Sequence, residues 1–295
     1  MKKILVFVIA VIAAHVSAAQ PKPLQNTLLW KISGKDLAQY SYIYLTGKTC
    51  DETLKLNEKA SQVLNAVNSI VAEYDLYGSK DAGKLAKTNI ALTDSQKINT
   101  NLSAIQVLRF ENMLKDAGYP AEALPQLRIY KLNMVLYMLT ALNGPCGVEK
   151  QPLAYEVALR PYAKKLNKEF TVLQNIDEFL AENNRLYNAY WVKNIGYVLE
   201  NGDGVKKAFA EEADLYAAAD LSALQKLYNS KILFNQLYNT DVQKEHSLLL
   251  ADKIEAFAKQ GPAFFTIQFA NVMYDNASVF EKLTQKGYTI TPVLN

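Results

Sequence analysis

Side chains that bind metal ions or act as general bases are scarce in this sequence. It contains two histidines, His15 and His246, and two cysteines, Cys50 and Cys146. A zinc hydrolase usually needs at least two His, or His with Cys, as ligands. No HExxH, no CxxC and no histidine pair at helical spacing is present. The sequence therefore argues against an ordinary zinc site. A carboxylate-only site for calcium or magnesium stays open, although no EF-hand-like loop is found.

Nucleophilic catalysis has little more support. No G-x-S-x-G elbow occurs, and a serine–histidine pair would have to use His246. That residue lies in a polar run, residues 243–247, which we interpret as the start of a helix. A lone histidine there is typical of a solvated surface residue that titrates near neutral pH. Neither a Walker loop nor GxGxxG precedes a helix. We therefore expect no catalytic residue, no bound metal and no cofactor.

The first 19 residues resemble a cleavable secretory signal peptide. Lys2 and Lys3 precede an apolar run from Ile4 to Ala14, which is too short for a stable membrane anchor. Small residues follow at 16–19, so we expect cleavage after Ala18 or Ala19; a retained anchor is the alternative. No cysteine directly follows the apolar run, so the segment does not have the pattern of a bacterial lipoprotein signal. The expected location is therefore the periplasm or the cell exterior.

Residues 20–295 have the composition of an ordinary globular domain. The whole chain is 50% hydrophobic and 21% charged, enough to bury a sizeable core. The first 19 residues hold two of the 32 basic residues and none of the 29 acidic ones, so the mature chain carries a net charge of +1. No cluster of Lys and Arg is present, and this argues against nucleic acid or an anionic membrane as partner. We expect one domain and leave the oligomeric state open.

Cys50 and Cys146 form an even pair in a chain expected to leave the cytoplasm. An oxidising compartment favours a disulfide, which would close a loop of about 95 residues and contribute roughly 4 kcal/mol through the unfolded state. Two buried free thiols are the alternative.

Short β-branched and aromatic runs alternate with helical patterns along the chain. Strands are predicted at residues 28–32, 41–46, 70–75, 170–173, 263–268 and 288–293. Helices are predicted at 53–67, 126–142 and 248–257. Pro161 should kink or restart a further helix. Residues 41–75 and 263–293 each run strand, helix, strand, and a mostly helical region from about Gly78 to Gln260 lies between them. This order predicts an α/β fold.

Three stretches in this order resemble a known family. The opening residues 28–35 and 41–44, the strand at Val71–Leu76, and the closing segments 264–267, 279–283 and 287–293 are similar to the TraB/GumN family, also called TraB/PrgY/GumN/TIKI. Residues 155–165 and 170–173 match more loosely. The resemblance implies an α/β fold in which short strands from both chain ends form a sheet covered by a long helical middle. It also implies a cysteine pair at Cys50 and Cys146, as in one branch of the family.

The motifs thought to bind metal in that family are altered here. Lys48 follows Leu45-Thr46-Gly47 where the family has Gly-Thr-x-His, and Gln174 replaces the glutamate of Leu-Glu-Thr. His246-Ser247 stands where the family has Arg-Asn. Asn271 replaces the histidine of Gly-x-x-His. Only Glu73 keeps its residue type. These changes remove two imidazoles and one carboxylate. They should therefore lower metal affinity far more than the ~10–100-fold that results from changing a single residue behind the ligands.

The resemblance therefore implies a remnant cleft lined by Lys48, Glu73, Gln174, His246 and Asn271, with Lys48 paired to Glu73 in place of a metal. We expect a non-catalytic protein that binds a peptide or protein there. The alternative is an active metal-dependent hydrolase of the family type.

Overall fold

The computed structural model describes residues 23–47, 50, 56–75, 97–128, 130–146, 155–185, 188–230, 240–275 and 277–294. The predicted signal peptide and Lys48 lie outside these ranges. None of the helices within the described ranges has both the length and the apolar character needed to cross a membrane.

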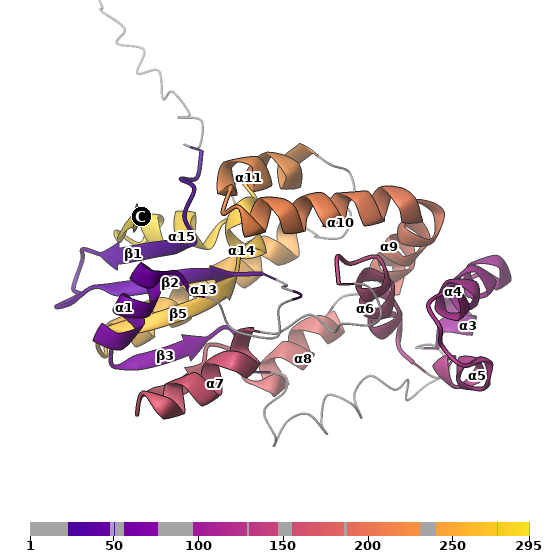
Figure 1. Cartoon of the computed structure of the whole chain (residues 1–295), viewed down its shortest axis with the longest axis horizontal. Coiled ribbons are helices and arrows are strands. Elements are labelled where there is room, and N and C mark those ends of the chain that lie inside the picture. Colours follow the sequence, from indigo (N-terminus) through magenta and orange to yellow (C-terminus); the bar gives the residue numbers. More distant parts are fainter. Residues whose placement is uncertain are drawn as a thin grey trace, which may run out of the picture.

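A six-stranded sheet forms one side of the molecule (Figure 1). Its order is β4-β3-β5-β2-β1-β6. The strands are β1 (Leu29–Ser33), β2 (Ser41–Thr46), β3 (Ser69–Ala72), β4 (Glu169–Val172), β5 (Ala263–Gln268) and β6 (Thr289–Pro292). Only β1 runs against its neighbours, because it pairs antiparallel with both β2 and β6, whereas the β2–β5, β5–β3 and β3–β4 pairs are parallel. The α/β fold is thus confirmed, with strands from both chain ends in one sheet.

The central strand comes from the end of the chain. Strand β5 lies between β2 and β3, with Tyr44 opposite Thr266 on one side and Ala72 opposite Thr266 on the other. Its residues Ala263 to Ile267 are all buried. A near-continuous apolar run of this kind is typical of a parallel strand covered on both faces.

Different helices cover the two faces of the sheet. Helices α1 (Glu58–Ala66) and α7 (Tyr155–Lys165) pack on one face, where their apolar side chains meet Phe264 and Ile70. Helices α13 (Thr240–Ala258) and α15 (Val279–Gln285) pack on the other face, against Phe265 and Ile267. Alternate residues of β5 therefore enter two separate core clusters.

The helical middle extends the core away from the sheet (Figure 1). It comprises α3 (Ile98–Asn101), α4 (Ala104–Asp116), the 3₁₀ turn Ala121–Ala123, α5 (Leu124–Leu127), α6 (Leu132–Leu142), α8 (Ile176–Arg185), α9 (Asn188–Glu200), α10 (Gly202–Ala217) and α11 (Leu221–Ser230). The short α14 (Ala270–Met273) lies outside it, between β5 and α15. One hydrophobic cluster continues from the α13 face of the sheet through α10 and α11 to α9, α6 and α4.

The structure differs in part from three of the helix predictions. The helix expected at residues 126–142 is divided into α5 and α6, because Lys131 leaves the helix in extended backbone and pairs with Lys97 in an isolated antiparallel bridge. Helix α7 runs through Pro161 without a new start. Proline removes only one backbone donor there, and Leu159 and Ala163 on either side of it are fully buried against the sheet. The described part of the helix expected at 53–67 begins at Glu58, after the side chain of Asn57 caps it.

The predicted disulfide is confirmed. Cys50 and Cys146 are bonded, with their Cα atoms 5.2 Å apart. The bond joins the segment after β2 to the turn after α6, so it links the sheet to the helical middle.

Candidate functional site

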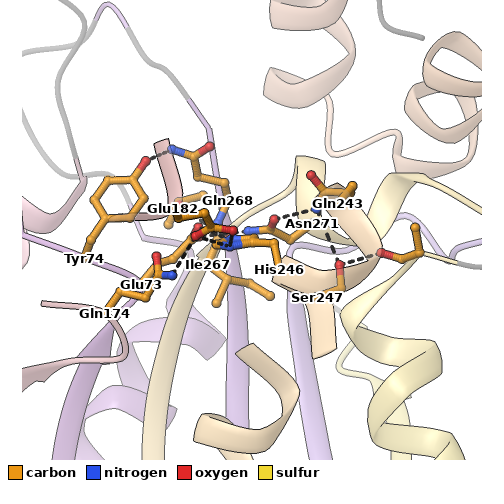
Figure 2. Close-up of polar contacts among 12 residues, drawn as sticks. Glu73, Tyr74, Gln174, Glu182, Gln243, His246, Ser247, Ile267, Gln268 and Asn271 are labelled. Atoms are coloured by element: carbon orange, nitrogen blue, oxygen red, sulfur yellow. Dashed lines mark hydrogen bonds and ion pairs between the residues drawn. The ribbon is translucent and has the colours of Figure 1, made fainter. Parts of the chain in front are cut away.

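Polar side chains gather where three neighbouring parallel strands end. Glu73 directly follows β3, Gln174 lies two residues after β4, and Gln268 ends β5. Backbone bonds continue the strand pairing into this region, since Leu173 N–H donates to Ala72 O at 2.7 Å and Gln174 N–H donates to Glu73 O at 2.8 Å. The carboxyl edge of parallel strands is where α/β proteins place their sites. Figure 2 shows the side chains that meet there.

Glu73 lies at the centre of this group. The residue is 2% exposed, and its carboxylate accepts hydrogen bonds on both oxygens. Oε2 accepts from Gln268 N–H at 2.6 Å and from Asn271 Nδ2 at 2.9 Å, and Oε1 lies 3.2 Å from His246 Nε2. Burial of a carboxylate is tolerated when such donors satisfy it.

His246 bridges two carboxylates. Its Nε2 faces Glu73, and its Nδ1 lies 3.0 and 3.1 Å from the two carboxylate oxygens of Glu182. Both ring nitrogens donate only in the protonated imidazolium. Burial alone would lower the pKa of His246, but hydrogen bonds and charge from Glu182 and Glu73 outweigh it and raise the pKa from 6.5 to about 9. The interpretation of His246 as a solvated surface residue is wrong, because its side chain is only 15% exposed.

Glu182 belongs to this group of side chains, and the sequence did not reveal it. It lies on α8, and one of its carboxylate oxygens also accepts from Gln174 Nε2 at 2.9 Å. A glutamate inside a polar helix carries no local signal, and only the packing of α8 brings it to the strand ends. We call Glu73, Gln174, Glu182, His246, Gln268 and Asn271 the strand-end cluster.

Helix α13 supplies a second line of contacts behind Asn271. Gln243 Nε2 donates to Asn271 Oδ1 at 2.9 Å, and Ser247 donates to the carbonyl oxygen of Ala277 (Figure 2). The amide of Asn271 is therefore held from both ends, by Gln243 and by Glu73. Such a fixed amide acts as a positioned donor to the Glu73 carboxylate.

Four of the five predicted cleft residues are brought together. Glu73, Gln174, His246 and Asn271 all belong to the strand-end cluster. Lys48 lies outside the described residues, so its ion pair with Glu73 stays a prediction.

The carboxyl ends of β2 and β5 lie side by side. Phe269 N–H donates to Thr46 O at 2.8 Å, and Phe269 stacks on Tyr216 of α10 with ring centroids 5.2 Å apart. The Tyr216 hydroxyl donates to Leu45 O at 3.2 Å. A Cβ atom on Gly47 would lie 2.9 Å from the Tyr216 ring and 3.0 Å from that of Phe269, so this position requires glycine.

In the arrangement that the structure shows, the side chains of the strand-end cluster do not converge on one point as ligands of a divalent metal ion do. The imidazole ring stands between the two carboxylates, so Glu73 and Glu182 approach it from opposite nitrogens and share no common point. A protonated ring has no lone pair to give to a metal. Within the described ranges, no three His, Cys, Asp or Glu side chains converge as a metal site requires.

The bridge predicts a pH dependence of stability. His246 has a folded-state pKa of about 9, above its ordinary value of 6.5. Its contribution to the free energy of unfolding is therefore fully present below about pH 6.5 and is lost as pH rises through about 9. The loss should amount to at most about 3 kcal/mol. Urea unfolding of the mature chain between pH 6 and pH 10 measures it.

The matched control for this experiment is His246→Gln, which keeps a polar side chain but cannot titrate. This variant should lose most of the dependence between pH 6.5 and 9, because His15 is the chain's only other histidine and lies in the predicted signal peptide. Equal slopes for the two proteins would contradict the bridge.

Comparison with known proteins agrees with this geometry. Residues 28–292 match the TraB/PrgY/gumN family. No curated protein and no solved structure matches the chain. The match covers nearly the whole sequence, including all six strands and every member of the strand-end cluster. The chain therefore belongs to the TraB/PrgY/gumN family.

Proposed function

We propose that this chain is an exported, non-catalytic member of its family that binds a peptide or protein at the carboxyl edge of its parallel strands. The observation that carries the proposal is the bridge of His246 between Glu73 and Glu182. A cation built into the chain occupies the position between two carboxylates. In this arrangement the carboxylates stabilise the fold and are not free to take part in hydrolysis.

The hydrogen bonds that both carboxylates already accept support the same conclusion. The two oxygens of Glu73 accept from a backbone N–H, an amide and the imidazole, and those of Glu182 accept from the imidazole and Gln174. A general base or a metal ligand needs an oxygen directed at the substrate or the ion. An oxygen turned toward a substrate or an ion would lose a charge-assisted hydrogen bond that it makes here.

Peptide binding is supported by the outer rim of the cluster. Gln268 and Tyr74 are half-buried, and the Gln268 amide donates to the Tyr74 hydroxyl. Tyr74 packs against Phe179, with ring centroids 5.4 Å apart. An aromatic ring beside a polar amide at the edge of a parallel sheet offers both the apolar contact and the hydrogen bonds that a peptide requires.

Export is supported by two features. The Cys50–Cys146 disulfide is typical of an oxidising compartment. The basic, apolar and small-residue segments of the first 19 residues are those of a cleavable signal peptide.

An active metal-dependent hydrolase is the second candidate. Glu73, Glu182 and His246 are metal-binding residue types in direct contact. Within the described part of the chain, Oε1 of Gln174 is buried beside them without a hydrogen-bond partner. Loss of the His246 proton would leave this group able to reorganise around an ion.

Elemental analysis and a hydrolysis assay distinguish the two candidates. The mature chain, purified without chelator, should contain no stoichiometric zinc, manganese or cobalt. It should also leave a mixture of unstructured peptides intact, with or without added metal. One ion per chain, lost in Glu73→Ala together with peptide cleavage, would establish the hydrolase instead.

Binding needs a separate measurement. Peptides selected from a random display library on the mature chain should bind in fluorescence anisotropy and lose about tenfold or more in affinity in Tyr74→Ala. The control is Tyr40→Ala, since Tyr40 is exposed and directly precedes the amino end of β2. Equal losses in the two variants, or no selected peptide, would contradict the proposed site.

A further inference from the structure

A pocket of about 590 Å³ lies beside the disulfide, between the turn after α6 and helix α10. Its volume falls within the range of small-molecule sites. One wall belongs to the turn and the other to the helix; the lining residues are Leu142, Gly144, Pro145, Cys146, Lys206, Ala210, Ala213 and Asp214. The strand-end cluster supplies none of them.

The disulfide borders this pocket through Cys146. Cys50 and Cys146 are both half-buried, and Cys146 is the one that lines the pocket. Thiol–disulfide exchange requires a thiolate that approaches one sulfur in line with the S–S bond, while the other sulfur leaves. A thiolate in the pocket meets Cys146 first. Cys50 is then the leaving group.

The charged residues of the pocket define the kind of thiol that fits. Lys206 and Asp214 are both exposed, and both belong to α10. Lys206 lines the same pocket as Cys146. A positive charge near a reacting sulfur favours the thiolate form and would attract the carboxylates of the molecule that carries it. Asp214 offers a partner for an amino group. Small peptide thiols carry carboxylates, an amino group and a thiol on one short chain.

We propose that this pocket is a thiol-exchange site for an anionic peptide thiol of the glutathione class. The thiolate attacks Sγ of Cys146, a mixed disulfide forms there, and the S–S bond to Cys50 breaks. The electron pair of that bond leaves on Cys50, which takes up a proton. A second thiol then attacks the sulfur of the bound peptide, so that the oxidised peptide disulfide departs and Cys146 is left as a thiol. Two peptide thiols are oxidised and one protein disulfide is reduced.

Exchange at this site would release Cys50 from the turn after α6. Cys50 lies three residues beyond Gly47, which is packed against Tyr216 of α10 and Phe269. The disulfide is the covalent link between Cys50 and that turn. Opening the bond removes this link, while the described contacts of Leu45 and Gly47 with Tyr216 remain. The proposal is independent of whether the strand-end cluster is catalytic.

The test uses the folded mature chain and reduced glutathione at neutral pH, with acid quenching, alkylation and peptide mass spectrometry. The first adduct should carry glutathione on Cys146, with Cys50 alkylated as a free thiol. Lys206→Glu should slow adduct formation by about threefold or more at low salt, and 1 M salt should shrink the difference. The matched control is Lys207→Glu, on the neighbouring exposed residue of α10, which does not line the pocket.

Two results would overturn the proposal. One is an adduct on Cys50, or equal rates for Lys206→Glu and Lys207→Glu. The other is a rate that rises with urea in parallel with global unfolding, because the disulfide would then react only in the unfolded chain.

Discussion

Replacing His246 by leucine is expected to destabilise the protein by about 2–4 kcal/mol at pH 6.5, since the change leaves two carboxylates without their shared cation. Glu73 and Glu182 would then lie close together in a largely buried place, with side chains 3% and 17% exposed. Removal of one partner from a buried charged group is strongly destabilising because the other charges keep their desolvation cost. Urea unfolding at fixed pH measures the difference.

A double variant separates this electrostatic effect from a simple loss of packing. Glu182→Gln with His246→Leu removes one of the two charges, so it should recover at least about 1 kcal/mol relative to His246→Leu alone. His246→Arg keeps a permanent cation, so its free energy of unfolding should be closer to that of the parent protein than that of His246→Leu. If the single and the double variant are equally unstable, the imidazolium bridge does not stabilise the fold as described.

Truncation of either phenylalanine of β5 is expected to have the largest effect of any single change. Phe264 and Phe265 are both 0% exposed, and they enter the core clusters on opposite faces of the sheet. Phe264→Ala and Phe265→Ala should each reduce the free energy of unfolding by about 3–5 kcal/mol, through lost burial and the cavity left behind. Two similar losses would show that both faces of the sheet are tightly packed.

The control for these variants is Leu108→Ala, because Leu108 is 57% exposed on α4. It should change stability by less than about 0.5 kcal/mol. Phe265→Leu keeps most of the side-chain volume, so its loss of stability should lie between those of Leu108→Ala and Phe265→Ala. A loss below about 1 kcal/mol for one phenylalanine would mean that its face of the sheet is poorly covered.

The strands were largely predictable because each is a short apolar run bounded by polar residues. The predicted strands at 41–46 and 263–268 have the bounds of β2 and β5. The strand predicted to reach residue 75 ends at Ala72, because Glu73 turns its side chain to the donors of β5 and α13. Local sequence patterns could not predict the order of the strands. The position of β5 between β2 and β3 depends on contacts between residues roughly 200 positions apart.

The candidate site was only partly predictable for a similar physical reason. Glu73, Gln174 and Asn271 were placed together by a family pattern that follows strand ends, and strand ends of a parallel sheet share an edge. The hydrogen bond between His246 and Glu182 depends on how α13 packs beside α8. The sequence of a polar helix does not indicate which other helix it packs against. The same limit explains why His246 was interpreted as a surface residue.

The late position of β5 has a consequence for the order of events during synthesis. Ala263 is the first residue of the strand that joins β2 to β3, in a chain of 295 residues. While the ribosome is still making the helical middle, β2 and β3 have no strand to lie between them, and the sheet cannot close. Contacts this distant in sequence form slowly, and the sheet stays incomplete until β5 has emerged. Until β5 has been made, the chain has no complete sheet and can still pass through a narrow channel in an extended form.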